Sequence, residues 1–236
     1  MKEKYIPAAI LGGLLALGML LAGMQLPDAV TAWKKADRVV TVKGLAEREV
    51  RADLVLWPLS YTVNAHTLEG LYNGQNQSEA KIRSFLTANG FTPEEISTVP
   101  LQVRDTWSDY YGDHKPEERY RGEGVVLVRT TQVDRVLEVM PKTSDLIKEG
   151  VLLSVNYQYR PQFLFTGLND IKPDMIAEAT QNARQAAEQF AQDSGSRVGK
   201  IRSAQQGYFS IEDLDSFTQD VKKVRVVTTI EFYVLD

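Results

Sequence analysis

Side chains that commonly carry chemistry are scarce in this chain of 236 residues. It contains no cysteine, which excludes thiol nucleophiles, thiolate metal sites and disulfides. Its two histidines, His66 and His114, lie far apart in the sequence, and His114 has carboxylates nearby at Asp109, Asp113 and Glu117. Isolated histidines are more often exposed or hydrogen-bonded residues than metal ligands. We therefore expect no metal site and no cofactor.

Nucleophile and phosphate motifs are equally sparse. No Gly-x-Ser-x-Gly elbow occurs, and Ser194-Gly195-Ser196 is typical of a helix end. A phosphate loop needs a helix after its glycines, whereas the helix expected here precedes Gly195. Asp105, Glu123 and His66 are only nominal candidates for an enzyme of an unrecognised class. We expect no catalytic residues.

The feature that stands out is a stretch rich in aromatic rings. Gly112 and Pro116 interrupt regular structure, so the stretch is predicted to be a loop between two strands. Exposed tyrosine and tryptophan rings are typical of interfaces, which makes this a candidate contact loop for a second copy or another protein. The alternative is that the rings fold back onto the sheet edge. The contact loop contains four aromatic residues, Trp107, Tyr110, Tyr111 and Tyr120.

The chain begins with an apolar run from Ile6 to Leu26, long enough to cross a bilayer as a helix. It exceeds the apolar core of a normal secretory signal, so we expect residues 1–32 to stay attached as a membrane anchor. The alternative is an exported soluble protein, cleaved near Ala32 after Val30-Thr31. Residues expected to form the anchor are Ile6, Leu11, Leu14, Leu17, Leu20, Leu26 and Trp33.

Charge does not settle which side of the membrane the body faces. Lys2 and Lys4 precede the run, while four basic residues follow it between Lys34 and Lys43. A cytoplasm-facing adaptor therefore stays open as an alternative. The formal charge of −4 makes nucleic acid a poor partner. The one dense basic cluster, Lys222 to Arg225, is interpreted as the solvated edge of a strand.

Strict alternation of apolar and polar residues predicts half-buried strands, which are typical of an antiparallel sheet. The residues from Trp57 to Ala65 alternate in this way, and so does a second stretch in which polar residues separate Leu153, Val155, Tyr157 and Tyr159. Further strands are expected near residues 38–46, 99–103, 119–131, 199–211 and 224–234.

Three helices are expected among these strands. The first covers residues 67–89 and ends at Asn89-Gly90, and the second covers 132–148 with a kink at Pro141. The third starts at Pro173, ends at Gly195 and has an alanine-rich face that would let it approach a sheet closely. The fold class is α+β, a mainly antiparallel sheet of about seven strands with three helices on one side, preceded by a transmembrane helix. The predicted domains are the anchor, 1–32, and the body, 33–236.

Four stretches of the body resemble the SIMPL-domain family, and the resemblance covers roughly residues 39–235. They are Val42-Lys43-Gly44-Leu45-Ala46-Glu47-Arg48-Glu49-Val50, Phe165-Thr166-Gly167-Leu168-Asn169, Ala179 to Ala191 followed by Asp193-Ser194-Gly195-Ser196, and Val224-Arg225-Val226-Val227. The resemblance implies an anchored protein of the cell envelope with its body in the periplasm, held at the inner membrane by one pass. It also implies self-assembly and a link to stress tolerance. Because none of the four stretches is a catalytic signature, we expect a role without catalysis.

Overall fold

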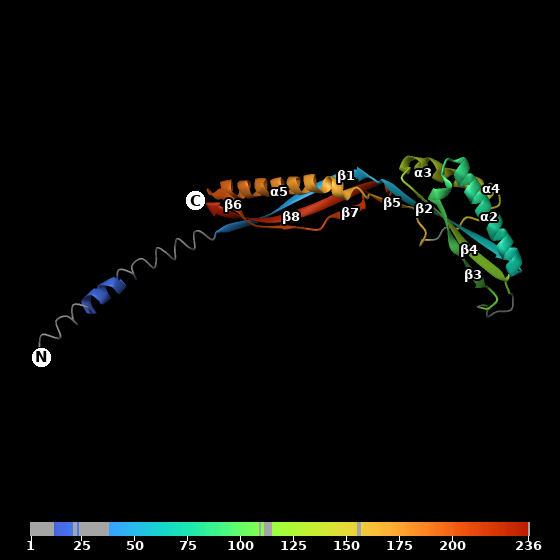
Figure 1. The fold of residues 1–236 in the computed structure, drawn as a ribbon, viewed down its shortest axis with the longest axis horizontal. Helices are drawn as coiled ribbons and strands as arrows, with labels where there is room; N and C mark the ends of the chain where they lie inside the picture. The colour runs from blue at the N-terminus through green and yellow to red at the C-terminus, as the bar shows by residue number, and fades with distance from the viewer. Residues whose placement is uncertain are drawn as a thin grey trace. The chain divides into compact units, whose positions relative to one another are not determined.

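The computed structural model describes residues 12–20, 23, 38–108, 110, 115–154 and 157–235. The chain divides into two compact units. The first combines the residues up to Glu47 with Lys172–Phe209 and Arg225 onward, and the second combines Arg48–Ile171 with Ser210–Val224. The elements of both units are labelled in Figure 1.

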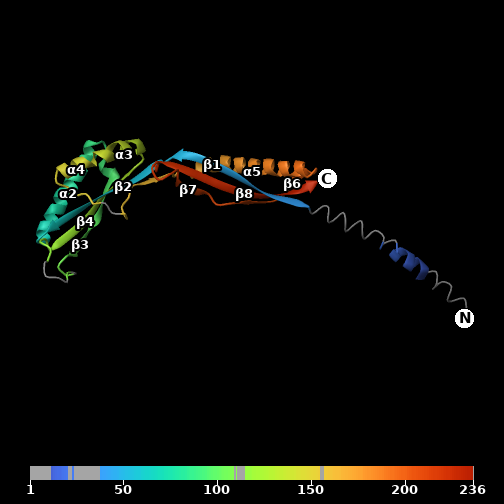
Figure 2. The same cartoon turned by 180° about the vertical axis from the view of Figure 1, so that it is seen from behind.

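Strands of the first sheet follow the order β1 (Val39–Arg51), β8 (Val221–Leu235) and β6 (Arg197–Gln206), and β7 (Ser210–Asp213) also pairs with β8. β6 and β8 are antiparallel. One long helix, α5 (Leu168–Asp193), lies along this sheet, as Figures 1 and 2 both show. Alternate residues of β8, from Val224 to Phe232, are buried, which is the period expected of a strand with one covered face.

α5 approaches β1 unusually closely. The buried residues of α5 recur at four-residue spacing and, except for the first, are alanines: Met175, Ala179, Ala183, Ala187 and Ala191. A β-carbon at Gly44 of β1 would lie 1.8 Å from the Ala179 carbonyl oxygen, so only glycine fits there. The Asn182 side chain donates a hydrogen bond of 2.7 Å to the Leu45 carbonyl. The predicted close approach of an alanine-rich helix to a sheet is confirmed.

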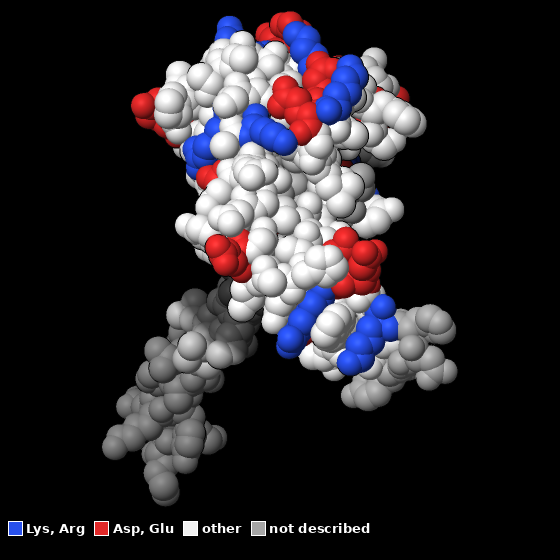
Figure 3. All heavy atoms as spheres, turned by 90° about the vertical axis from the view of Figure 1, so that its right-hand side faces the viewer, with Lys and Arg blue, Asp and Glu red and all other residues white. Residues whose placement is uncertain are grey.

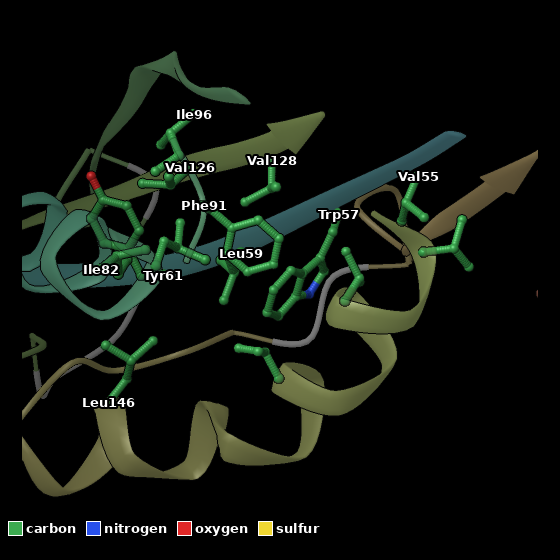
Figure 4. Close-up of a cluster of buried hydrophobic side chains, with 14 of the residues drawn as sticks. Val55, Trp57, Leu59, Tyr61, Ile82, Phe91, Ile96, Val126, Val128 and Leu146 are labelled. Carbon is green, nitrogen blue, oxygen red and sulfur yellow. The ribbon is translucent and has the colours of Figure 1, made fainter. Parts of the chain in front are cut away.

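The second sheet has the order β3 (Ile96–Asp105), β4 (Tyr120–Thr130), β2 (Leu54–Ala65) and β5 (Gln162–Leu164), and every pair is antiparallel. Its helices are α2 (Leu68–Ala88), α3 (Val133–Val139) and α4 (Ser144–Lys148), with short 3₁₀ turns at η2 (Pro93–Glu95) and η3 (Met140–Thr143). Inward-facing residues of β2 and β4 pack with Phe91, Ile82 and Leu146 in the core drawn in Figure 4. The rings of Trp57 and Phe91 meet edge to face, with centroids 6.0 Å apart.

Helix boundaries follow local signals. Thr67 caps α2 by accepting a hydrogen bond from the Gly70 amide at 3.1 Å. Gly90, Gly150 and Gly195 all have positive φ after a helix, as helix-ending glycines do. Pro141 interrupts the second predicted helix, which becomes α3, η3 and α4.

The predicted α+β class is confirmed, but the single sheet is wrong, because the strands of the described residues form two sheets of four. β1 and β2 are separated only by Ala52 and Asp53, yet they belong to different sheets. Alternation identifies a strand without specifying its partner, so the sequence pattern did not separate the sheets.

Two further expectations need correction. No strand forms over the described part of Leu153–Tyr159, because only Leu152–Ser154 stays beside β2, and Leu153 forms an isolated bridge with Tyr61. Tyr157 is in a turn and 79% exposed. α5 begins at Leu168, so Pro173 lies inside the helix rather than at its start.

Only part of the predicted anchor is described. Residues 12–20 are helical, and Leu14, Leu17 and Leu20 in this stretch are exposed. Within the described ranges, none of the helices combines the length and the apolarity that crossing a membrane requires. The other anchor residues, Ile6, Leu11, Leu26 and Trp33, lie outside the described residues.

Candidate functional site

The contact loop joins β3 to β4 in the second unit. Trp107, Tyr110 and Tyr120 are described there, whereas Tyr111 and the neighbouring residues 109 and 112–114 lie outside the described residues. Trp107 and Tyr110 are each 38% exposed, and Tyr120 is half-buried. The loop therefore presents aromatic area to solvent at the end of the β3–β4 ladder.

An ion pair closes the base of the contact loop. Arg119 donates two hydrogen bonds to one Asp105 carboxylate oxygen, from Nε at 3.0 Å and from Nη2 at 2.8 Å. The other oxygen of Asp105 accepts from the Trp107 amide at 3.0 Å. Bonding to Arg119 lowers the pKa of Asp105 below its ordinary value, so the carboxylate stays charged at neutral pH.

Cations of the same loop hold the Trp107 ring. The Arg119 guanidinium carbon lies 5.4 Å from the centroid of the indole and 5.0 Å from that of the Tyr120 ring, and the Lys115 ammonium lies 5.2 Å from the indole. The indole N–H donates to the Pro116 carbonyl at 3.0 Å. The ring is fixed by contacts within the loop, and it is not among the buried core residues.

The three nominal enzyme candidates have separate surroundings. Asp105 is bonded to Arg119, Glu123 pairs with Arg121 at 3.5 Å, and His66 is exposed just beyond β2. Among the described residues, no interaction joins His66 to either carboxylate, and no group of three His, Asp or Glu side chains has the arrangement of a metal site. His114 lies outside the described residues.

Lys222 is a buried cation that was not expected from the sequence. Lys222 is only 6% exposed, and its ammonium is hydrogen-bonded to the Asp213 carboxylate of β7. The interpretation of Lys222 as part of a solvated edge is wrong, because β8 is an interior strand of its sheet. A signal was available: Lys222 is in phase with Val224 and Val226, which are buried.

Lys222 lines a pocket with a volume of about 560 Å³. All of its lining residues belong to the second unit. On the face drawn in Figure 3, basic and acidic side chains are neighbours and form no field of a single sign.

Comparison with known proteins gives the family. The chain matches the SIMPL family, described as proteins of unknown function (DUF541), over residues 40–229, so the chain belongs to the SIMPL family. The resemblance seen in the sequence is confirmed. No curated protein matches. A crystal structure of a hydrolase from Listeria innocua aligns with 80% of this chain and 91% of its own, at 17% identity and a TM-score of 0.23. This score is too low to indicate a shared fold.

Proposed function

We propose that this SIMPL-family chain is a membrane-anchored protein of the cell envelope that acts without catalysis, by binding a second copy of itself or another protein. The contact loop is the surface proposed for that binding. The N-terminal apolar run is the proposed anchor, and the body lies in the periplasm. The proposed link to stress tolerance is indirect, because a chain without cysteine has no thiol redox chemistry.

One observation carries the proposal: Trp107 and Tyr110 stay 38% exposed on a loop whose base is closed by the Asp105–Arg119 ion pair. A ring that is already held in place loses little conformational freedom on binding, so more of its buried area contributes to affinity. Tryptophan and tyrosine with a nearby arginine are the residues that most often dominate binding energy at interfaces.

The test replaces Tyr110 and Tyr111 together by alanine. Truncating anchoring rings commonly costs about 2 kcal/mol or more of binding free energy, roughly a 30-fold loss of affinity. We expect the variant to assemble more weakly in sedimentation velocity at unchanged melting temperature. Tyr208→Ala is the matched control, since Tyr208 is an exposed tyrosine of the first unit, whereas the contact loop belongs to the second.

Three results would contradict the contact loop as the binding surface. Unchanged assembly of the double variant would place binding elsewhere, and a strongly lowered melting temperature would mean that the rings serve the fold. Loss of assembly in Tyr208→Ala to the same degree would remove the assignment to the contact loop.

The proposed location has its own test. A reporter enzyme that is active only outside the cytoplasm, fused to the carboxyl terminus, should be active if the body is periplasmic. An inactive, stably expressed fusion would favour the cytoplasm-facing adaptor. Mass spectrometry of the native protein should find the first residues still present, whereas a terminus at Trp33 would show cleavage after Ala32.

A further inference from the structure

The pocket beside Lys222 is built from strand ends of the second unit. One wall is a continuous segment through β5, and the others come from β7 and the start of β8. Its volume of about 560 Å³ lies within the range of small-molecule sites in proteins. The lining residues are Arg160, Pro161, Gln162, Phe163, Leu164, Phe165, Ile211, Asp213, Gln219 and Lys222.

The Lys222 side chain brings a charge into a position that the strand period assigns to the core. The side chain is 8% exposed, whereas that of its partner Asp213 is 48% exposed. A lysine ammonium has three N–H donors. In the part of the chain that the structure describes, Asp213 is the one hydrogen-bond partner recorded for them. Because buried donors need acceptors, the remaining N–H groups favour a ligand that supplies oxygen atoms.

A second cation reinforces this preference. Arg160 also lines the pocket, and its guanidinium carbon lies 4.3 Å from the centroid of the Tyr157 ring. Stacking uses the face of a guanidinium and leaves its N–H groups pointing outward in its plane. With Lys222 and Arg160 opposed by Asp213 alone, the lining carries a net charge of +1, which complements an anion.

The rest of the lining is suited to an apolar body. Leu164 is 37% exposed and Ile211 is 38% exposed, and both line the pocket. β5 pairs with β2 along one edge, and its residues line the pocket consecutively. Consecutive residues of an extended strand present backbone N–H and C=O groups as well as side chains, and an extended ligand could pair with them.

We propose that this pocket binds a carboxylate carried by an apolar body, with the carboxylate at Lys222 and Arg160 and the apolar body against Leu164 and Ile211. Such a group occurs in a free acylated amino acid and at the apolar carboxyl terminus of a peptide. In either ligand the carboxylate accepts hydrogen bonds from the N–H groups of Lys222 that Asp213 does not use, and the half-exposed Asp213 carboxylate competes with the ligand for the ammonium.

Two probes represent the two sources, N-acetyl-leucine and N-acetyl-Ala-Ala-Leu, each titrated into the full-length protein by calorimetry. Both should bind at millimolar concentration or below. Their carboxamide forms have the same body without the charge, and they should bind at least about tenfold more weakly, because charge-assisted hydrogen bonds are the stronger ones. Tighter binding of the tripeptide than of the single residue points to a chain end, and equal binding points to a free acid.

Variants locate the site. Lys222→Met keeps an unbranched stem and removes the ammonium, so it should weaken both probes at least about tenfold. Asp213→Asn removes the competing carboxylate, so it should bind both probes more tightly than the wild type does. Lys142→Met is the control, since Lys142 pairs with Glu138 at 2.8 Å on the surface outside this pocket.

The proposal is overturned if neither probe binds the wild type, if the carboxamides bind as tightly as the acids, or if Asp213→Asn binds the acids no more tightly. If Lys222→Met does not fold, the carboxamide comparison and Asp213→Asn still decide. These outcomes are independent of the contact loop, because none of its four aromatic residues lines this pocket.

Discussion

Gly44 is the position where we expect one added methyl group to destabilise the fold most. In Gly44→Ala the new β-carbon would lie 1.8 Å from the Ala179 carbonyl oxygen and 2.5 Å from the Ala183 amide nitrogen. Both are backbone atoms of α5, so no side chain can turn away to make room. Real β-carbon contacts essentially never fall below 3.0 Å, so α5 must move outward by more than about 1 Å.

That movement weakens a whole interface rather than one contact. Ala179, Ala183 and Ala187 are fully buried, the last two in a cluster with Val42 and Phe232, and alanine has no flexible end that could refill a gap. A radial gap of about 0.5–1 Å forfeits a quarter to a half of each dispersion contact. We expect a loss of about 3 kcal/mol, the upper end of the usual range for overpacking.

Hydrogen exchange followed by mass spectrometry gives a local measurement of this loss. Amides of α5 should exchange about 100-fold faster in Gly44→Ala, because each 1.4 kcal/mol is a factor of ten in an opening equilibrium. Lys43→Ala is the control, since Lys43 is the neighbouring residue on the exposed face of β1. Unchanged exchange in α5 of Gly44→Ala, or an equal acceleration in Lys43→Ala, would refute the close-approach argument.

Three other changes test separate parts of the second unit. The Tyr61 hydroxyl is buried without a hydrogen-bond partner among the described residues, so Tyr61→Phe should change the free energy of unfolding by less than about 1 kcal/mol at neutral pH. Burial raises the pKa of Tyr61 to about 12, so the folded state favours the neutral phenol, and the resulting stability is lost as the pH rises from 10 toward 12. Denaturation at pH 7 and pH 11 should therefore show a smaller alkaline loss in Tyr61→Phe than in the wild type. Arg119→Gln removes the main cause of the low pKa of Asp105, so a carbon NMR titration should find that pKa raised toward its ordinary value. Thr67→Ala deletes the cap on the Gly70 amide and should destabilise α2 by about 1 kcal/mol, seen as faster hydrogen exchange in its first turn.

Local features of the fold were predictable from the sequence, because they depend on neighbours along the chain. The helix ends at Gly90, Gly150 and Gly195 follow from glycine's tolerance of positive φ. The alternation from Trp57 to Ala65 identified most of β2 for the same kind of reason.

Long-range features were not predictable in this way. β5 has three residues, which is too short for a period to show, and the Asp53 carboxylate that holds the following turn at the Thr166 and Gly167 amides is more than a hundred residues away. Lys222 could have been assigned to the core from its phase in β8, but its partner Asp213 lies beyond a turn that carries no such pattern. The contact loop could be located from its aromatic composition. The ion pair between Asp105 and Arg119 at its base could not be predicted from the sequence.

The strand order β1-β8-β6 has a consequence for how the chain is made. β8 follows every other strand in the sequence, yet it is the partner of both β1 and β6. When β1 and α5 have left the ribosome, β8, the strand that lies between β1 and β6, has not yet been synthesised. The alanine face of α5 can then pack only on an incomplete sheet. The strands of the second sheet are complete by Leu164, long before β8 is synthesised. The first sheet is therefore expected to form later than the second. A chain whose synthesis stops before Val221 exposes the apolar face of α5, which chaperones or proteases can bind.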